Sequence, residues 1–418
     1  MRQGEEIFRG EVHTDGGRIT YVGPLGAESG GRQDFDREID CGMNLLMPGF
    51  KNAHTHSGMT FLRSHADDLP LHEWLSEQVF PFEAKLTGDD IYTLTELAIL
   101  EYLRSGITSI MDMYLTPETI AKACEDRGMR CVQVGPVMDF GISVDQIDHW
   151  YQTLNNENPL TSFCLGFHAE YTCSPDRLAQ IAELVHKYKA PVFAHCAETV
   201  AETEACVKRH DKTPVGYLAS MGVWDYGGAG YHMIYVTEDD MEIMKQFHID
   251  AVTNPASNMK LASGMAPIQD FLDRGIRVAI GTDGPASNNC LDMFREMFLT
   301  TALSKIRMGD ASAVPAIKVL KMATSVGAHV MRIPEADTLA EGKLADMILI
   351  DLHQPNMQPI HNIQANLVYS GSKANVMLTM IHGKILYDTL EGRGIFHVGK
   401  EPQEIYRKSQ EIADRIFS

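Results

Sequence analysis

The chain is poor in basic residues relative to acidic ones. Lysine and arginine number 36 against 56 aspartates and glutamates, and the formal net charge is −20 at pH 7. Phosphate-rich partners need a basic surface, because the protein must neutralise their charge. We therefore expect no nucleic-acid partner and no anionic membrane as a partner.

Long apolar runs and paired cysteines are also missing. No apolar stretch approaches the roughly 18 residues of a membrane span. The polar start MRQGEEIFRGEV does not resemble a signal peptide. The eight cysteines are scattered without Cys-x-x-Cys spacing, as in proteins that keep their thiols reduced. These features predict a cytoplasmic protein.

The middle of the chain, residues 49–340, alternates short apolar strands with amphipathic helices. Strand candidates include SIMDMY, CVQVGPV, CLGFHAEY, APVFAHC, GYHMIYV, IDAVTN and VAIGTD, and helical candidates include DDIYTLTELAILEYLRSG and SPDRLAQIAELVHKYK. Such alternation predicts a parallel sheet. We expect an α/β fold with a (β/α)8 TIM-type barrel over these residues.

The two ends of the chain show a different sequence pattern. A barrel needs roughly 250 residues, so a chain of 418 residues should carry a second module. Short strands and turns recur in EVHTDGG, RITYVGPLG, ADMILIDL and NVMLTMIHGKILYD. We expect residues 1–48 and 341–418 to form one small β-sandwich with a C-terminal helix.

Residues that can bind metals stand where apolar runs end. MPGFKNAHTHSGMT carries His54 and His56, and positions two apart on a strand face the same side. Further along, APVFAHCAET supplies His195 and Glu198, GAGYHMIYV supplies His232, and VAIGTDGPASNN supplies Asp283. In a barrel of this kind the active site lies at the C-terminal ends of the strands. Imidazole and carboxylate groups collected there predict a metal site.

With these residues located, the chain resembles the amidohydrolase superfamily. The segments that carry the resemblance are NAHTHSGMTFLRSHADDLPLHEWL, HAEYTCSP, AHCAET, TNPASNMKLASG, GTDGPASNNCLDMF and EGKLADMILIDL. The resemblance covers almost the whole chain. It is closest to the branch that contains cytosine and guanine deaminases, chlorohydrolases and 5-methylthioadenosine/S-adenosylhomocysteine deaminases.

The resemblance implies one divalent metal ion, Zn2+ in preference to Fe2+. The residues that match the family's metal ligands are His54, His56, His195 and Asp283. Binuclear branches carry a bridging lysine on the fourth strand, and the candidate here, CVQVGPVMDFG, has none. His232 matches the histidine that hydrogen-bonds the attacking water. Asp283 would also accept the proton of that water.

The same resemblance implies a hydrolytic deaminase that converts the 6-amino group of an adenosine-type nucleoside to the inosine analogue. Glu198 matches the acid that works on the ring nitrogen. Glu83 falls where nucleoside deaminases hold the ribose, and His168 where they contact the base or ribose. Trp74 is a further candidate for the base pocket. The substrate candidates are adenosine, 5′-deoxyadenosine and 5′-methylthioadenosine.

The sequence departs from the family pattern in three places. Glu170 stands where a proline is usual, and Tyr235 stands where a second histidine is frequent. Relatives that accept S-adenosylhomocysteine hold its carboxylate with arginines after the fourth strand. Residues 136–160 contain no arginine or lysine, so we expect this substrate to be a poorer one.

Two alternatives stay open. The first is another hydrolysis on the same scaffold, of guanine, a pterin, cytosine or an s-triazine. The second is a metal-free scaffold without catalysis, although such relatives lose ligands first and this chain keeps them all. A homo-oligomer is compatible with the sequence, and an opening strand could precede Met1.

Overall fold

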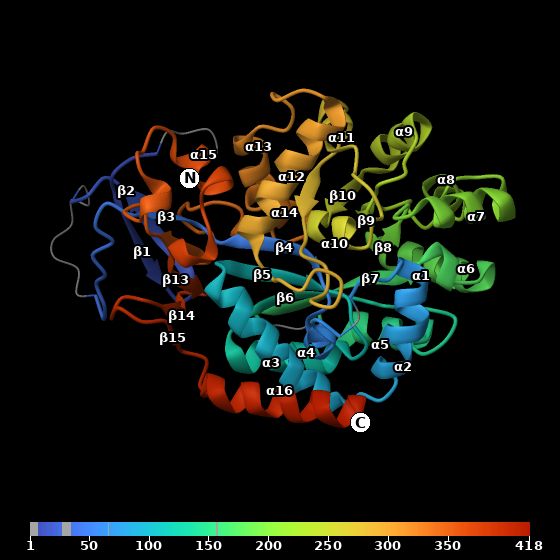
Figure 1. Ribbon diagram of the computed structural model, residues 1–418, viewed down its shortest axis with the longest axis horizontal. Helices are drawn as coiled ribbons and strands as arrows, with labels where there is room; N and C mark the ends of the chain where they lie inside the picture. The colour runs from blue at the N-terminus through green and yellow to red at the C-terminus, as the bar shows by residue number, and fades with distance from the viewer. Residues whose placement is uncertain (1–6, 27–34, 66, 156–157) are drawn as a thin grey trace.

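The computed structural model describes residues 7–26, 35–65, 67–155 and 158–418. Parts of the predicted N-terminal sandwich segment, residues 1–6 and 27–34, lie outside the described residues. In Figure 1 the antiparallel strands from the two chain ends lie at one end of the molecule, and the parallel strands with their helices fill the rest.

Eight parallel strands form the central sheet, and each pairs with the next along the chain. They are β4 (Phe50–Thr55), β5 (Ile107–Asp112), β6 (Arg130–Val134), β7 (Thr161–Ala169), β8 (Val192–Cys196), β9 (Gly228–His232), β10 (Ile249–Thr253) and β11 (Val278–Ile280). Hydrogen bonds also join the segment that follows the last strand to the first strand, and in one of them Asp283 N donates to His54 O at 3.0 Å. Thr282 N donates to the side chain of Asn52 at 2.8 Å.

Helices follow the strands and cover the sheet. They are α3 (Gly88–Arg104), α4 (Pro117–Arg127), α5 (Val144–Thr153), α6 (Pro175–Tyr188), α7 (Val200–His210), α8 (Pro214–Ser220), α9 (Glu238–Phe247), α10 (Pro255–Lys260), α11 (Ile268–Asp273), α12 (Met293–Met308), α13 (Ala316–Met322) and α14 (Ser325–Val330). Most of the parallel strands are buried along their whole length. That burial explains their continuous apolar sequence, since strands covered on both faces need no polar alternation.

The chain ends build an antiparallel sheet beside the barrel. Its order is β15-β14-β13-β12-β3, from β3 (Leu45–Pro48), β12 (Met347–Ile350), β13 (Val376–Ile381), β14 (Lys384–Asp388) and β15 (Ile395–Phe396). A separate hairpin consists of β1 (Glu11–Asp15) and β2 (Arg18–Gly23). Ile19 and Val22 of the hairpin share a buried cluster with Ala345 and Met347. The predicted fold class, a barrel with a sandwich from both ends, is confirmed.

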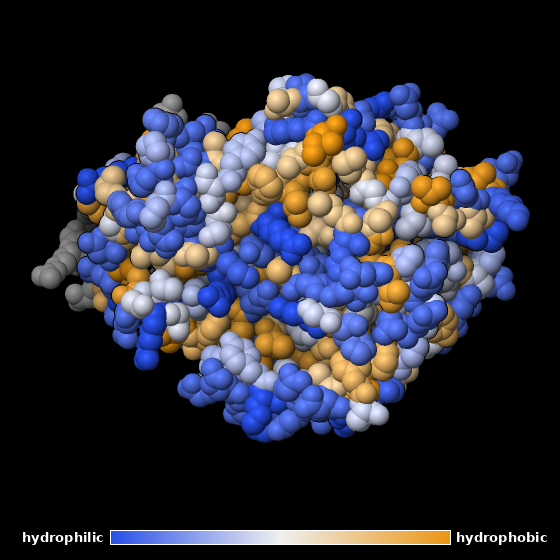
Figure 2. Space-filling model, viewed as in Figure 1, coloured by the Kyte–Doolittle hydropathy of each residue, from blue (hydrophilic) through white to orange (hydrophobic). Residues whose placement is uncertain are grey.

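The C-terminal helix α16 (Pro402–Phe417) leaves the sandwich and packs along α3 of the barrel (Figure 1). The ring of Phe417 stacks on His65 with centroids 3.7 Å apart. Figure 2 shows hydrophilic residues on the outward face of this helix and hydrophobic residues between it and the barrel. In the described part of the chain, no helix is both long and apolar enough to cross a membrane.

Short helices occupy the long connection between β4 and α3. They are η1 (Ser57–Leu62), α1 (Leu71–Glu73), the π-helical η2 (Trp74–Val79) and α2 (Phe80–Glu83). The remaining short elements are η3 (Glu170–Thr172), η4 (Pro334–Ala336), η5 (Pro355–Met357), α15 (Ile363–Tyr369) and η6 (Lys373–Asn375). The connection from β4 to α3 carries Trp74 and Glu83 to a cavity that His56 and Asp283 also line.

Candidate active site

The end of β4 holds His54 and His56 side by side. Their ring centroids lie 4.7 Å apart, and His54 is fully buried. Neither ring nitrogen of His54 has a hydrogen-bond partner among the residues that the structure describes. Leaving buried polar atoms unpaired is costly. The ring of His54 is therefore arranged for a ligand that the protein chain itself does not supply.

Asp283 follows β11 and faces both of these histidines. Its Oδ1 lies 3.2 Å from His56 Nε2 and 3.5 Å from His54 Nε2. Its Oδ2 accepts hydrogen bonds from the hydroxyls of Ser257 at 2.5 Å and Ser287 at 3.0 Å. Burial opposes ionisation here, but the close contacts of His54 and His56 and the charges of His56 and His232 outweigh it and hold the pKa of Asp283 well below its usual range.

Backbone carbonyls fix the orientation of two of the imidazoles. His195 Nδ1 lies 2.7 Å from His168 O, and His56 Nδ1 lies 2.5 Å from Met113 O. A carbonyl oxygen can only accept, so both rings carry a proton on Nδ1 and turn Nε2 toward the cavity. This arrangement is typical of histidines that bind a metal through the second nitrogen.

The donor set fits one divalent cation. Two groups of possible ligands share His54. One group adds His195 and His232, and the other adds His56 and Asp283. Within each group the ligand atoms lie within 4.8 Å of one another. All four predicted ligands are therefore brought together at the carboxyl ends of the strands, with His232 beside them. Imidazole nitrogens and one carboxylate suit zinc or iron.

Glu198 borders the same cluster. It is 5% exposed, and its Oε2 lies 3.8 Å from His232 Nε2. The hydroxyl of Ser263 donates to Oε1 at 3.3 Å. Burial raises the pKa of this carboxyl, and the nearby Asp283 carboxylate adds to the effect. Such surroundings favour the protonated, neutral form of the carboxyl group.

The three predicted substrate contacts line the cavity that opens onto this cluster. Burial raises the pKa of Glu83 to about 7 and lowers the pKa of His168 to about 3, so His168 is a neutral imidazole. Glu83 Oε1 and Trp74 Nε1 are buried, and neither has a hydrogen-bond partner in the described part of the chain. Both atoms are thus available to a polar ligand.

Sequence reasoning missed several residues that support the site. Asn258 Oδ1 lies 2.7 Å from His232 Nδ1, and Tyr171 lines the cavity beside Glu198. The hydroxyls of Ser257 and Ser263 donate hydrogen bonds to the carboxyl groups of Asp283 and Glu198, respectively. Asn258 and both serines lie in the motif TNPASNMKLASG, but the resemblance to the family assigns no role to these polar side chains.

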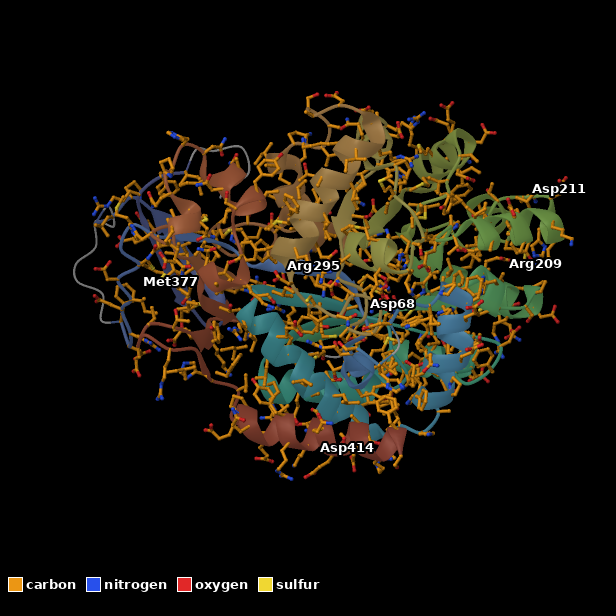
Figure 3. The ribbon with its side chains drawn as sticks, in the orientation of Figure 1. Asp68, Arg209, Asp211, Arg295, Met377 and Asp414 are labelled. Carbon is orange, nitrogen blue, oxygen red and sulfur yellow. The ribbon has the colours of Figure 1, made fainter. Side chains whose placement is uncertain are left out.

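The structure also explains two departures from the family pattern. The hydroxyl of Tyr235 donates to Ser263 O at 2.6 Å. Glu170 is 3% exposed and accepts from Arg209 at 2.6 Å. His210 Nε2 lies 3.2 Å from the other oxygen of the same carboxylate. Figure 3 shows Arg209 on α7 at the outer edge of the molecule.

The model of the amidohydrolase family matches residues 45–386, and the chain belongs to this family. The predictions of this superfamily and of a hydrolytic enzyme are therefore confirmed. Among proteins of this family, 5-methylthioadenosine/S-adenosylhomocysteine deaminase of Thermoanaerobacter pseudethanolicus is 36% identical over 412 residues, covering 97% of this chain and 94% of the relative. The enzyme of the same name from Syntrophomonas wolfei is 39% identical over 406 residues, covering 95% and 92%.

Solved structures agree with the fold. An adenosine deaminase from Xanthomonas campestris with bound zinc superposes with a TM-score of 0.90 at 29% identity, covering 97% of this chain and 93% of that one. Atrazine chlorohydrolase from Arthrobacter aurescens in complex with zinc superposes with a TM-score of 0.86 at 21% identity, covering 96% and 94%. The second likeness concerns the fold alone.

Proposed function

We propose that this protein is a metal-dependent hydrolytic deaminase of adenosine-type nucleosides, which releases ammonia and leaves the inosine analogue. One observation carries the proposal. A buried carboxyl group, Glu198, borders a histidine and aspartate cluster that fits a divalent cation, and both open onto one cavity. The names of the relatives, which act on 5′-methylthioadenosine and S-adenosylhomocysteine or on adenosine, support the same reaction.

The proposed metal ligands are His54, His56, His195 and Asp283, holding one ion, Zn2+ in preference to Fe2+. Such an ion, when bound, would act as a Lewis acid and lower the pKa of water from about 15.7 toward about 7. Two observations support this ligand set. The ring nitrogens of His54 have no hydrogen-bond partner among the described residues, and the carbonyl contacts at Nδ1 of His56 and His195 leave Nε2 as the nitrogen that faces the cavity.

The chain's own groups move the protons. Water adds to C6 of the ring, and Asp283, which stays ionised beside its histidines, accepts the proton of that water. Glu198 gives its proton to N1 as the C–O bond forms. The Glu198 carboxylate then takes the proton of the C6 hydroxyl group and passes it to the departing amine, which leaves as ammonia while C6 becomes a carbonyl. The proton on Asp283 returns to Glu198 before the next turnover. His232, held at Nδ1 by Asn258, would orient the water with Nε2.

Glu83, His168 and Trp74 are the proposed substrate contacts. An ionised carboxylate has lone pairs for both ribose hydroxyls, and Glu83 Oε1 has no other partner among the described residues. Trp74 offers an apolar ring on the wall of the cavity. These contacts favour a nucleoside over a free base.

A neutral 5′ group fits the cavity better than an amino-acid tail. Neither lysine nor arginine occurs among the described residues that line it, and Pro136 and Met138 stand on the wall that follows β6. A buried carboxylate without a cationic partner costs several kcal/mol, on the order of a 100-fold loss of affinity or more. We therefore infer that 5′-methylthioadenosine and 5′-deoxyadenosine are better substrates than S-adenosylhomocysteine.

The test is a side-by-side measurement of kcat/KM on the zinc-loaded enzyme, with adenosine, 5′-methylthioadenosine, S-adenosylhomocysteine and free adenine. Loss of the adenine absorbance reports the reaction, and released ammonia confirms it. We expect activity on the first two, less on the third and little on adenine. A preference for S-adenosylhomocysteine would refute the neutral 5′ group, and equal activity on adenine would refute ribose recognition. Turnover of guanine, a pterin, cytosine or an s-triazine instead would refute the nucleoside assignment.

A further inference from the structure

The backbone turns sharply between β8 and α7, and this turn carries Glu198. Ala197 has a φ of +54°, a left-handed conformation that residues with a Cβ rarely adopt. Such a conformation costs on the order of 1 kcal/mol or more and persists only where its surroundings impose it. On one side, the amides of Ile234 and Tyr235 both donate to Ala197 O at 2.9 Å.

On the other side, the carboxylate of Glu202 accepts hydrogen bonds from the backbone amides of the turn. Ala197 N donates to Glu202 Oε1 at 2.8 Å, and Glu198 N donates to Oε2 at 2.7 Å. Thr199 N also points at Oε2, at 3.4 Å. Glu202 is 2% exposed. Its two oxygens therefore bridge two successive amides, the second of which belongs to Glu198.

An ordinary capping box would not require these contacts. In such a box the acid at the third helical position accepts from the N-cap amide. Asp240 at the start of α9 does this at 2.8 Å from Thr237 N, and Asp90 at the start of α3 does so at 2.8 Å from Thr87 N. In α7 the corresponding distance is 3.4 Å. The carboxylate of Glu202 lies closer to the turn before the helix than to the cap.

We propose that Glu202 is the positioning residue of the active site: its carboxylate fixes the backbone from which Glu198 projects, and thereby aims the Glu198 carboxyl at the substrate ring. The inference rests on the proposed role of Glu198 and adds a residue that does not itself reach the cavity. Glu202 acts on catalysis only through Glu198.

Glu202→Gln is the sharpest perturbation, because the side chain keeps its shape. Both carboxylate oxygens accept hydrogen bonds from amides. A glutamine offers one oxygen and one NH₂ group, so in either orientation one amide of the turn faces a donor. The backbone of the turn must then shift so that this amide moves away from the NH₂ group. A displacement of about 1 Å at a reacting group can cost on the order of 100-fold in rate.

The experiment compares wild-type enzyme, Glu202→Gln, Glu198→Gln and the double variant, all zinc-loaded, with 5′-methylthioadenosine. We expect Glu202→Gln to lower kcat by about 10- to 100-fold with KM and zinc content little changed. In the Glu198→Gln background the same change should cost less than about 3-fold, because there is no proton donor left to aim. Asp240→Asn, which alters a capping box that holds no amide of this turn, is the matched control and should keep wild-type kcat.

A purely structural role predicts a different result. Glu202→Gln would then lower the rate by the same factor with or without Glu198, and that additivity would overturn the inference. Unchanged kcat in Glu202→Gln would overturn it as well. If that variant fails to fold, Glu202→Asp, which keeps the charge and is one methylene too short to bridge both amides, must show the same dependence on Glu198. A wild-type enzyme without nucleoside deaminase activity would refute the proposed function itself.

Discussion

Replacing Glu198 with glutamine removes a proton donor while leaving its surroundings intact. Glutamine keeps an oxygen that can accept from Ser263, and the Glu198 backbone amide keeps its bond to Glu202. The site cluster of His54, His56, His195 and Asp283 is untouched. We therefore expect Glu198→Gln to retain the wild-type fold and metal content, and to lose most of its turnover.

The size of the loss follows from the chemistry. A positioned acid–base group typically contributes about 10²- to 10⁴-fold to a rate, which corresponds to about 3 to 5 kcal/mol of activation free energy. Glu198 is 5% exposed, so bulk water cannot readily replace it as the donor to N1. This argues for the upper part of the range.

The assay is loss of adenine absorbance under saturating 5′-methylthioadenosine, with zinc content and melting temperature measured on the same preparations. Glu204→Gln is the control, because Glu204 lies on the same helix and is exposed. A Glu198→Gln enzyme that deaminates within about 3-fold of wild type would contradict the assignment, since a removed general acid cannot cost so little.

Three further predictions concern the cation, the ribose and the stability of α7. A chelator should abolish activity and lower the melting temperature, and added Zn2+ should restore both, because a ligand that binds only the folded state stabilises it. The pKa of Glu83 is about 7, so kcat/KM should rise as pH increases through about 7 and Glu83 ionises, and Glu83→Gln should lose this rise. Arg209→Ala should lower the free energy of unfolding by about 1–3 kcal/mol in urea titrations, because it removes a partner of the buried Glu170 carboxylate. Arg407→Ala, which breaks an exposed ion pair, should change it by less than about 1 kcal/mol.

The barrel and the candidate metal cluster could be predicted from the sequence because one rule governs both. Buried parallel strands read as continuous apolar runs, and their carboxyl ends meet at one face of the barrel. His54, His195, His232 and Asp283 each stand at or just past such an end. The convergence of these residues, which are far apart in the chain, can therefore be predicted without knowing the conformations of the loops.

The supporting residues could not be predicted in this way. Asn258 and Ser263 reach the site from α10 and the loop after it, so their bonds to His232 and Glu198 depend on how loops of neighbouring strands pack together. No periodicity signals such contacts. The packing of α16 on α3 could not be predicted either. The pattern of an amphipathic helix shows that one face is buried, but it does not show which element covers that face.

Two departures from the family pattern, Tyr235 and Glu170, lie on either side of the segment that carries Glu198. Tyr235 bonds the backbone of Ser263, whose hydroxyl reaches Glu198. Glu170 holds the far end of α7 through Arg209, and the near end of that helix follows the turn of Glu198. A cation held by His54, His56, His195 and Asp283, as proposed, would set the geometry of that cluster and leave it little freedom to change. Tyr235 and Glu170 therefore bear on the segments that hold Glu198, whereas His54, His56, His195 and Asp283 match the family pattern.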